Sequence, residues 1–126
     1  KSLEGVGDLI EQAQEVDGIL VLTKEIEVDS ADTLRKLGQA LQGKMKSGVA
    51  CLATTISGKS TLICIVTDDL ILKGLKAGDL VNDVAKIADG RGGGNPNMAQ
   101  AGVNNPEKIK EALESVTEIV REKLVN

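Results

Sequence analysis

The spacing of hydrophobic residues predicts a domain in which helices and strands alternate. Apolar residues recur every three or four positions from Lys1 to about Val16, which predicts an amphipathic helix. The dipeptide Asp17-Gly18 then predicts a turn. An uninterrupted apolar run from Ile19 to Leu22 follows it and is typical of a strand that is covered on both faces.

A second helix is predicted to begin after Ser30, because serine is a preferred N-cap residue and Asp32 would lie in the first turn. This helix ends before Gly48. Its core-facing stripe consists of Leu34, Leu37, Leu41 and Met45. The spacing of these four side chains fits one helical face, so the helix should cover the sheet on one side.

The segments 49–56 and 61–67 are rich in apolar and β-branched residues and flank a polar Ser-Gly-Lys-Ser turn, which predicts a β-hairpin. If residues 56 and 59 pair across a two-residue turn, Cys51 lies opposite Cys64 on one face of the hairpin. No neighbouring group would lower the pKa of either thiol. We therefore expect both cysteines to act as small core side chains.

Several features of the second half of the chain predict how its elements begin. Asp68 and Asp69 are predicted to end the third strand. An aspartate pair can bind Mg²⁺, but no third carboxylate has a suitable spacing. We therefore expect the pair to cap a turn. Asp79 is predicted to cap a helix over residues 80–88. Asn105 is predicted to cap a final helix that has Pro106 at its first position.

The segment 90–102 contains the densest group of glycines in the chain. Such a segment between two helices is often a mobile surface loop. Alternatively, its bare backbone amides could cradle a phosphate, with Arg91 supplying positive charge. The spacings of the known phosphate-binding motifs are absent, and the segment follows a predicted helix instead of a strand. The residues alone leave both interpretations open.

These elements together predict the α/β class, with a mixed sheet of about four to five strands packed with helices and preceded by one N-terminal helix. The first two strands, which a helix connects, should be parallel, and the hairpin should add an antiparallel pair. We divide the chain into residues 1–17, the end of a helical subdomain or a linker helix, and a globular domain over residues 18–126. Phe, Tyr and Trp are absent, so the core must be aliphatic.

The composition excludes several kinds of chemistry. The chain has no histidine, which excludes Ser-His-Asp and Cys-His catalysis and histidine metal ligands. Without aromatic residues it has no platform for stacking unpaired bases. We therefore expect no catalytic residue and no metal site in this chain. The net charge of −4 is unfavourable for RNA binding, although lysines cluster locally at residues 44–46 and 73–76.

The glycines 92–94, the link through Pro96 and the run Met-Ala-Gln-Ala-Gly at 98–102 resemble a signature of the C-terminal domain of bacterial alanyl-tRNA synthetases. That domain belongs to the DHH-associated group, which certain phosphoesterases share. The resemblance extends over about residues 1–126. Arg91 interrupts the glycine run and Val103 replaces a second glycine, which are departures from the pattern. The phosphoesterases usually have a histidine where this chain has Asn95, so the resemblance favours the synthetases.

The resemblance implies a cytoplasmic alanine–tRNA ligase whose chemistry, with ATP, Mg and Zn, takes place elsewhere in the parent chain, so no cofactor is expected in this fragment. It implies that this domain binds the outer corner of tRNA, mediates dimerisation and links aminoacylation with editing. Neither DNA nor a membrane is an expected partner. The candidate RNA-binding residues are Lys73, Lys76, Arg91, Gly92, Gly93, Gly94, Asn95 and Gln100.

We expect Lys73, Lys76 and Arg91 to lie near one another beside the glycine-rich segment. Two other functions remain open. The domain could bind a nucleotide phosphate as part of a DHH phosphoesterase, or it could be a purely structural dimerisation module.

Overall fold

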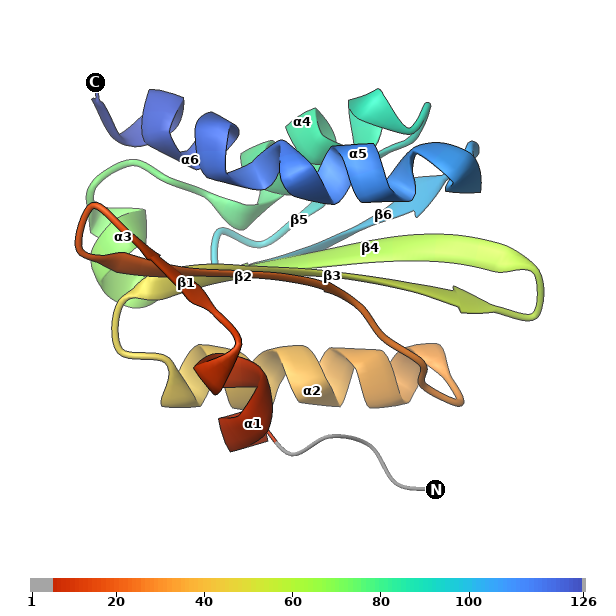
Figure 1. Cartoon of the computed structure of the whole chain (residues 1–126), viewed down its shortest axis with the longest axis horizontal. Coiled ribbons are helices and arrows are strands. Elements are labelled where there is room, and N and C mark those ends of the chain that lie inside the picture. Colours follow the sequence, from red (N-terminus) through yellow and green to blue (C-terminus); the bar gives the residue numbers. More distant parts are fainter. Residues whose placement is uncertain (1–5, 126) are drawn as a thin grey trace.

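The computed structural model describes residues 6–125, and its central feature is a six-stranded mixed sheet with helices on both faces (Figure 1). The strand order is β1-β2-β3-β4-β6-β5. The strands are β1 Gln14–Val16, β2 Ile19–Glu25, β3 Gly48–Ile56, β4 Lys59–Val66, β5 Arg91–Gly94 and β6 Met98–Val103. The helices are α1 Val6–Glu11, α2 Ala31–Lys44, α3 Asp68–Leu72, α4 Ala77–Ile87, α5 Ile109–Glu114 and α6 Val116–Val125, and a 3₁₀ turn, Pro106–Lys108, precedes α5.

The pairing of the strands confirms the mixed α/β class. Strands β2 and β3 are parallel and are connected by α2, whereas every other neighbouring pair is antiparallel. The hairpin β3–β4 has the predicted register, with Ile56 opposite Lys59 and Cys51 opposite Cys64. The sheet has six strands, one more than the predicted maximum of five.

The N-terminal helix is shorter than predicted. Helix α1 ends at Glu11, and residues 14–16 form β1, which pairs with β2. Asp17 and Gly18 have φ values of 53° and 87°, which give the turn the twist that a tight hairpin favours. The residues before this turn therefore pair with β2 instead of continuing the helix. The part of the prediction at residues 1–5 lies outside the described residues.

The predicted helix starts have different outcomes. The Oγ of Ser30 accepts a hydrogen bond from the backbone N–H of Thr33 at 3.1 Å, which confirms the N-cap. Asp79, in contrast, lies in the first turn of α4, because the helix already begins at Ala77 with Lys76 as its N-cap. Asn105 does precede the Pro106 turn, but its side chain makes no capping hydrogen bond there.

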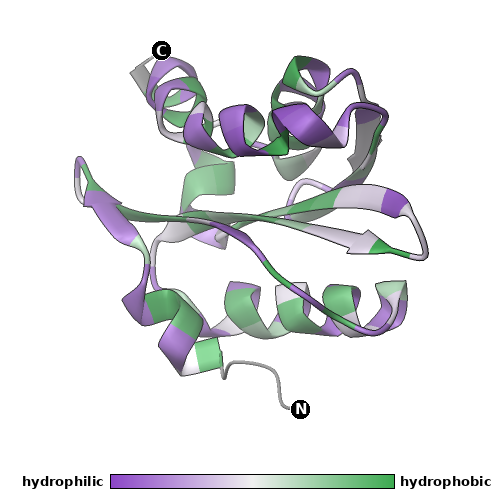
Figure 2. Ribbon diagram, turned by 45° about the vertical axis from the view of Figure 1, so that its right-hand side comes forward, coloured by the Kyte–Doolittle hydropathy of each residue, from purple (hydrophilic) through white to green (hydrophobic). Residues whose placement is uncertain are grey.

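The core consists of two layers, one on each face of the sheet. Helices α1 and α2 cover one face, and α4, α5 and α6 cover the other (Figure 1). Figure 2 shows hydrophilic and hydrophobic residues alternating along these helices, as expected of elements that bury one side. Among residues 6–125, no helix is both long and apolar enough to cross a membrane.

Candidate nucleic-acid interface

Glycines 92–94 of the segment 90–102 belong to β5, an exposed edge strand, and do not form the mobile surface loop that was one of the two interpretations. Its glycines allow an unusually close approach to β6. A Cβ atom on Gly92 would overlap the carbonyl oxygen of Gln100, and one on Gly94 would lie 2.9 Å from the Cα of Ala99. Gly93 differs, because a Cβ atom there would have no neighbour within 4 Å. Alternate glycines are therefore required by packing within the chain.

Helix α4 runs along β5 on its other side. The backbone N–H of Gly92 lies 3.4 Å from Oδ1 of Asn82, and the N–H of Gly90 donates to the carbonyl oxygen of Ala85 at 2.8 Å. At the start of the helix, a Cβ atom on Gly78 would come within 3.3 Å of the oxygen of Gly94. These contacts hold β5 between α4 and β6, yet all four of its residues remain exposed.

Asn95 and Gln100 lie at the exit of β5 and on the strand beside it. Asn95 is exposed, and its N–H donates to the carbonyl oxygen of Met98 at 3.0 Å, which closes the turn between β5 and β6. Gln100 pairs with Gly93 and is half-buried. Gln100 and Met98 are two positions apart on β6, so their side chains point to the same face of the sheet. Met98 packs on the side of α1 and α2, and Gln100 therefore lies on the face opposite α4.

The three candidate cations do not form one cluster. Lys73 and Lys76 flank the short loop between α3 and α4, and the N–H of Ala77 donates to the carbonyl oxygen of Pro96 at 2.7 Å, which places this loop at the end of β5. Arg91 lies at the beginning of β5, beside the opposite end of α4. Since α4 and β5 run side by side in opposite directions, they separate Arg91 from the lysines. The expectation of a single cluster is therefore wrong.

Lys73 has a cationic neighbour that the sequence analysis missed. It lines a cavity of about 270 Å³ together with Arg121 of α6 and Asp17 of the β1–β2 turn. Nε of Arg121 lies 3.4 Å from Oδ2 of Asp17. The floor of this cavity is apolar and consists of Val16, Ile19, Leu70, Val120 and Leu124. No local pattern connects residues 73 and 121, because tertiary folding alone brings them together.

The aspartate pair does not end a strand and cap a turn, as we expected, because β4 ends at Val66 and both residues lie in the first turn of α3, a short helix that the sequence did not predict. Oδ2 of Asp69 accepts a hydrogen bond from Ser47 at 2.5 Å, and Oδ1 accepts one from Thr67 at 2.6 Å. These hydrogen bonds stabilise the carboxylate and lower the pKa of Asp69. Nε2 of Gln42 lies 3.3 Å from Oδ1 of Asp68. Among the described residues, no group of three or more Cys, Asp or Glu side chains is arranged to hold a metal ion.

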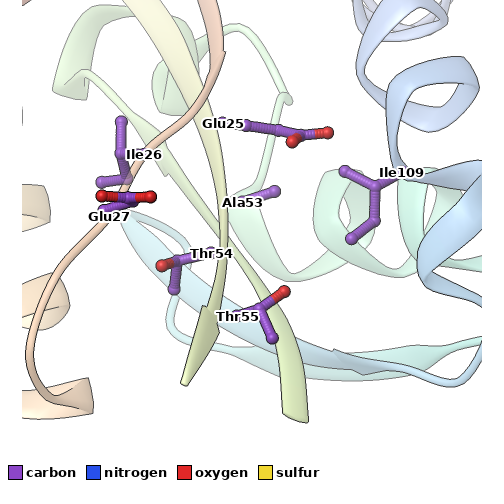
Figure 3. A pocket seen from close by; sticks show the side chains of 7 residues that line it. All are labelled: Glu25, Ile26, Glu27, Ala53, Thr54, Thr55 and Ile109. Atoms are coloured by element: carbon purple, nitrogen blue, oxygen red, sulfur yellow. The ribbon is translucent and has the colours of Figure 1, made fainter. Parts of the chain in front are cut away.

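A second cavity, of about 300 Å³, lies at the carboxyl ends of β2 and β3 (Figure 3). Glu25 extends toward Ile109 of α5, whereas Glu27 lies with Ile26 away from it. Thr54, Thr55 and Ala53 complete the lining. The lining has two carboxylates and no cation, so this cavity does not suit the phosphates of RNA.

Comparison with known proteins agrees with this architecture. Residues 18–122 match the model of the DHHA1 domain. The chain belongs to the DHHA1 domain family. This DHHA1 domain is 46% identical over 114 residues to an alanine–tRNA ligase of Alkaliphilus oremlandii and 49% identical over 116 residues to one of Nitrosomonas europaea. The alignments cover 90% and 92% of this chain but only 13% of each relative.

Solved structures show the same relationship. The DHHA1 domain superposes on the C-Ala domain of Aquifex aeolicus alanyl-tRNA synthetase with a TM-score of 0.77 and 26% identity, over 86% of this chain and 96% of that one. This similarity confirms the resemblance to the C-terminal domain of alanyl-tRNA synthetases. A pGpG-specific phosphodiesterase of Vibrio cholerae shares the fold alone, with a TM-score of 0.54 and 10% identity.

Proposed function

We propose that this DHHA1 domain is the tRNA-binding domain of an alanine–tRNA ligase, that it contacts the outer corner of tRNA, and that it links aminoacylation with editing. The similarity to two alanine–tRNA ligases and to nearly the whole C-Ala domain supports this proposal. In the proposal, the cytoplasmic parent enzyme uses ATP, Mg and Zn in its other domains. This domain contributes binding and no chemistry.

The observation that carries the proposal is the exposed backbone of β5 with one cationic side chain near each end. Lys76 precedes α4 and Arg91 follows it, and α4 has 11 residues. A helix of that length spans about 16 Å, so the two cations can reach phosphates several nucleotides apart. Their separation suits an extended polyanion better than a single nucleotide phosphate.

The composition determines the mode of recognition. Without aromatic side chains, the domain reads the shape and backbone of folded RNA and does not stack on bases. Lys73, Lys76 and Arg91 contact phosphates, and the exposed glycine backbone offers hydrogen bonds to ribose hydroxyls. Since the whole domain carries a net charge of −4, binding depends on this local cationic strip and weakens as salt rises.

The test compares two double variants that change the net charge equally. Lys76→Glu with Arg91→Glu alters the proposed strip, whereas Lys36→Glu with Lys44→Glu alters exposed positions on α2, in the layer across the sheet. We expect the first variant to lose tRNA affinity by about tenfold or more and its salt slope to fall by about two. The α2 variant should change little. Equal effects of both variants would mean that net charge alone governs binding.

A structural dimerisation role is the second candidate, because Leu72 on α3 is 89% exposed. A large apolar side chain so exposed is suited to contact with another surface. Light scattering of the wild type and of Leu72→Lys, with and without tRNA, separates the two functions. A dimer that Leu72→Lys converts to a monomer, with no tRNA binding in either form, would favour the structural role.

A further inference from the structure

Two thiols face each other at the centre of the sheet. Cys51 of β3 and Cys64 of β4 are directly paired, both are 0% exposed, and their Sγ atoms are 2.7 Å apart. A disulfide bond has a length of about 2.0 Å, so the two sulfur atoms need only a small approach to reach bonding distance once an oxidant removes two electrons and two protons. Neither thiol has a role in the proposed RNA interface.

The register places this pair where a cross-strand disulfide fits. Ile56 and Lys59 close the two-residue turn of the hairpin, and paired positions then alternate between hydrogen-bonded and non-hydrogen-bonded. Counting from that turn, the fifth pair beyond it, Cys51–Cys64, is a non-hydrogen-bonded pair. Such pairs have Cα atoms about 4.5 Å apart, within the range that disulfides span.

A neighbouring pair supports this assignment. Thr55 and Ser60 have the same parity in the hairpin, and their hydroxyl oxygens are 2.9 Å apart. Side chains at both positions therefore approach each other across the strands, as expected for non-hydrogen-bonded pairs. The approach of the two sulfur atoms follows from the register of the hairpin.

We propose that Cys51 and Cys64 form a reversible oxidation site, at which a peroxide converts the two thiols into an intramolecular disulfide. One thiolate attacks the peroxide, whose O–O bond breaks, and gives a sulfenic acid and water. The other thiol then attacks the sulfenic sulfur, the S–S bond forms, and a second water leaves. The two sulfur atoms together lose two electrons and the two thiols lose two protons, which the two oxygen atoms of the peroxide accept.

Burial sets the rate of this reaction. Both cysteines lie in the core between the sheet and α4, α5 and α6, and this burial raises the pKa of the Cys64 thiol. Burial disfavours the thiolate and keeps peroxide away from the sulfur atoms, so oxidation proceeds through local opening of the helical layer. The pair therefore responds to sustained oxidation and stays reduced during brief exposure. Once formed, the bridge restricts the unfolded chain and raises the midpoint temperature of unfolding.

The experiment treats the folded domain with hydrogen peroxide and follows intact mass and free thiols after denaturation. The wild type should lose two hydrogen atoms in mass and both thiols, and dithiothreitol should restore them. The single variants Cys51→Ala and Cys64→Ala have no partner thiol and should gain oxygen atoms instead. A matched control carries Thr55→Cys and Ser60→Cys in a background with Cys51→Ala and Cys64→Ala.

The control pair has the same cross-strand geometry, but residue 55 is exposed, so its disulfide should form faster. Slow closure of the native pair, with a higher midpoint temperature that is lost on reduction, supports the proposal. If the wild type keeps both thiols under conditions that fully oxidise the control, or gains oxygen as the single variants do, the proposal is wrong.

Discussion

A Cβ atom placed on Gly92 of β5 would stand 2.6 Å from the Cβ atom of Ala101 on β6. Side chains do not approach so closely, so the strand could not keep its present position with any other residue there. One position further along, Gly93 faces open space. Close packing against β6 therefore requires glycine at position 92, whereas no neighbouring atom excludes a side chain at position 93. The sequence alone does not distinguish these two adjacent glycines.

Alanine substitutions should separate these reasons. We expect Gly92→Ala to lower the free energy of unfolding by about 1–3 kcal/mol, because β5 must move away from β6. Gly93→Ala is the matched control and should stay within about 0.5 kcal/mol of the wild type. Urea denaturation measures both. Equal losses would contradict the packing account, because the alanine side chain meets β6 at position 92 only.

The start of α2 offers a second test. Ser30→Ala removes the oxygen that accepts the N–H of Thr33, and the free energy of unfolding should fall by about 1 kcal/mol. Ser30→Asn keeps an acceptor at the cap and should retain most of the stability. A result in which both variants are equally destabilised would contradict a capping role for this side chain.

The pH dependence of the free energy of unfolding should show how much the ionised carboxylate of Asp69 contributes to stability. Hydrogen bonds from Ser47 and Thr67 hold the pKa of this carboxylate below its usual range, so its protonated form is disfavoured in the folded state. Its contribution is present above the unfolded pKa, near 3.9, and is lost as the pH falls through the lower folded pKa. Ser47→Ala should make stability fall less steeply below about pH 4.

The measurement is urea denaturation at several acidic pH values, with Asp69→Asn as the control that cannot titrate. Because Asp69 is solvent-exposed, the difference between Ser47→Ala and the wild type should be small. Its direction should still be a less steep loss of stability in Ser47→Ala as the pH falls. If the stability of Ser47→Ala, Asp69→Asn and the wild type falls in parallel, the hydrogen bonds do not couple to protonation.

Local signals in the sequence predicted the parts of the fold that local chemistry determines. The turn at residues 57–58 sets the register that brings Cys51 opposite Cys64, and the side chain of Ser30 caps its own helix. Both depend on residues within one hairpin or one helical turn. The parallel pairing of β2 and β3 was also predictable, because a helical connection leaves few other arrangements.

The missed elements depend on contacts between distant segments. Val16 fits helical spacing as well as strand spacing, and pairing with Ile19 in the short strand β1 decides between them. Strand β5 has no apolar pattern, and its neighbours β6 and α4 define it. The separation of Arg91 from Lys76 follows from this same packing. The sequence suggested Lys73, Lys76 and Arg91 as candidate cations, but it did not predict that Arg91 lies at the opposite end of α4 from the two lysines.

The ion pair between Asp17 and Arg121 joins residues that are 104 positions apart, and α6 covers the first hairpin beside it. During translation, Val16 and Ile19 therefore leave the ribosome long before Val120 and Leu124 can shelter them. At typical elongation rates the interval is on the order of ten seconds. Until α6 emerges, the nascent domain presents an uncovered apolar surface, and this layer of its core is completed only when α6 packs against the first hairpin.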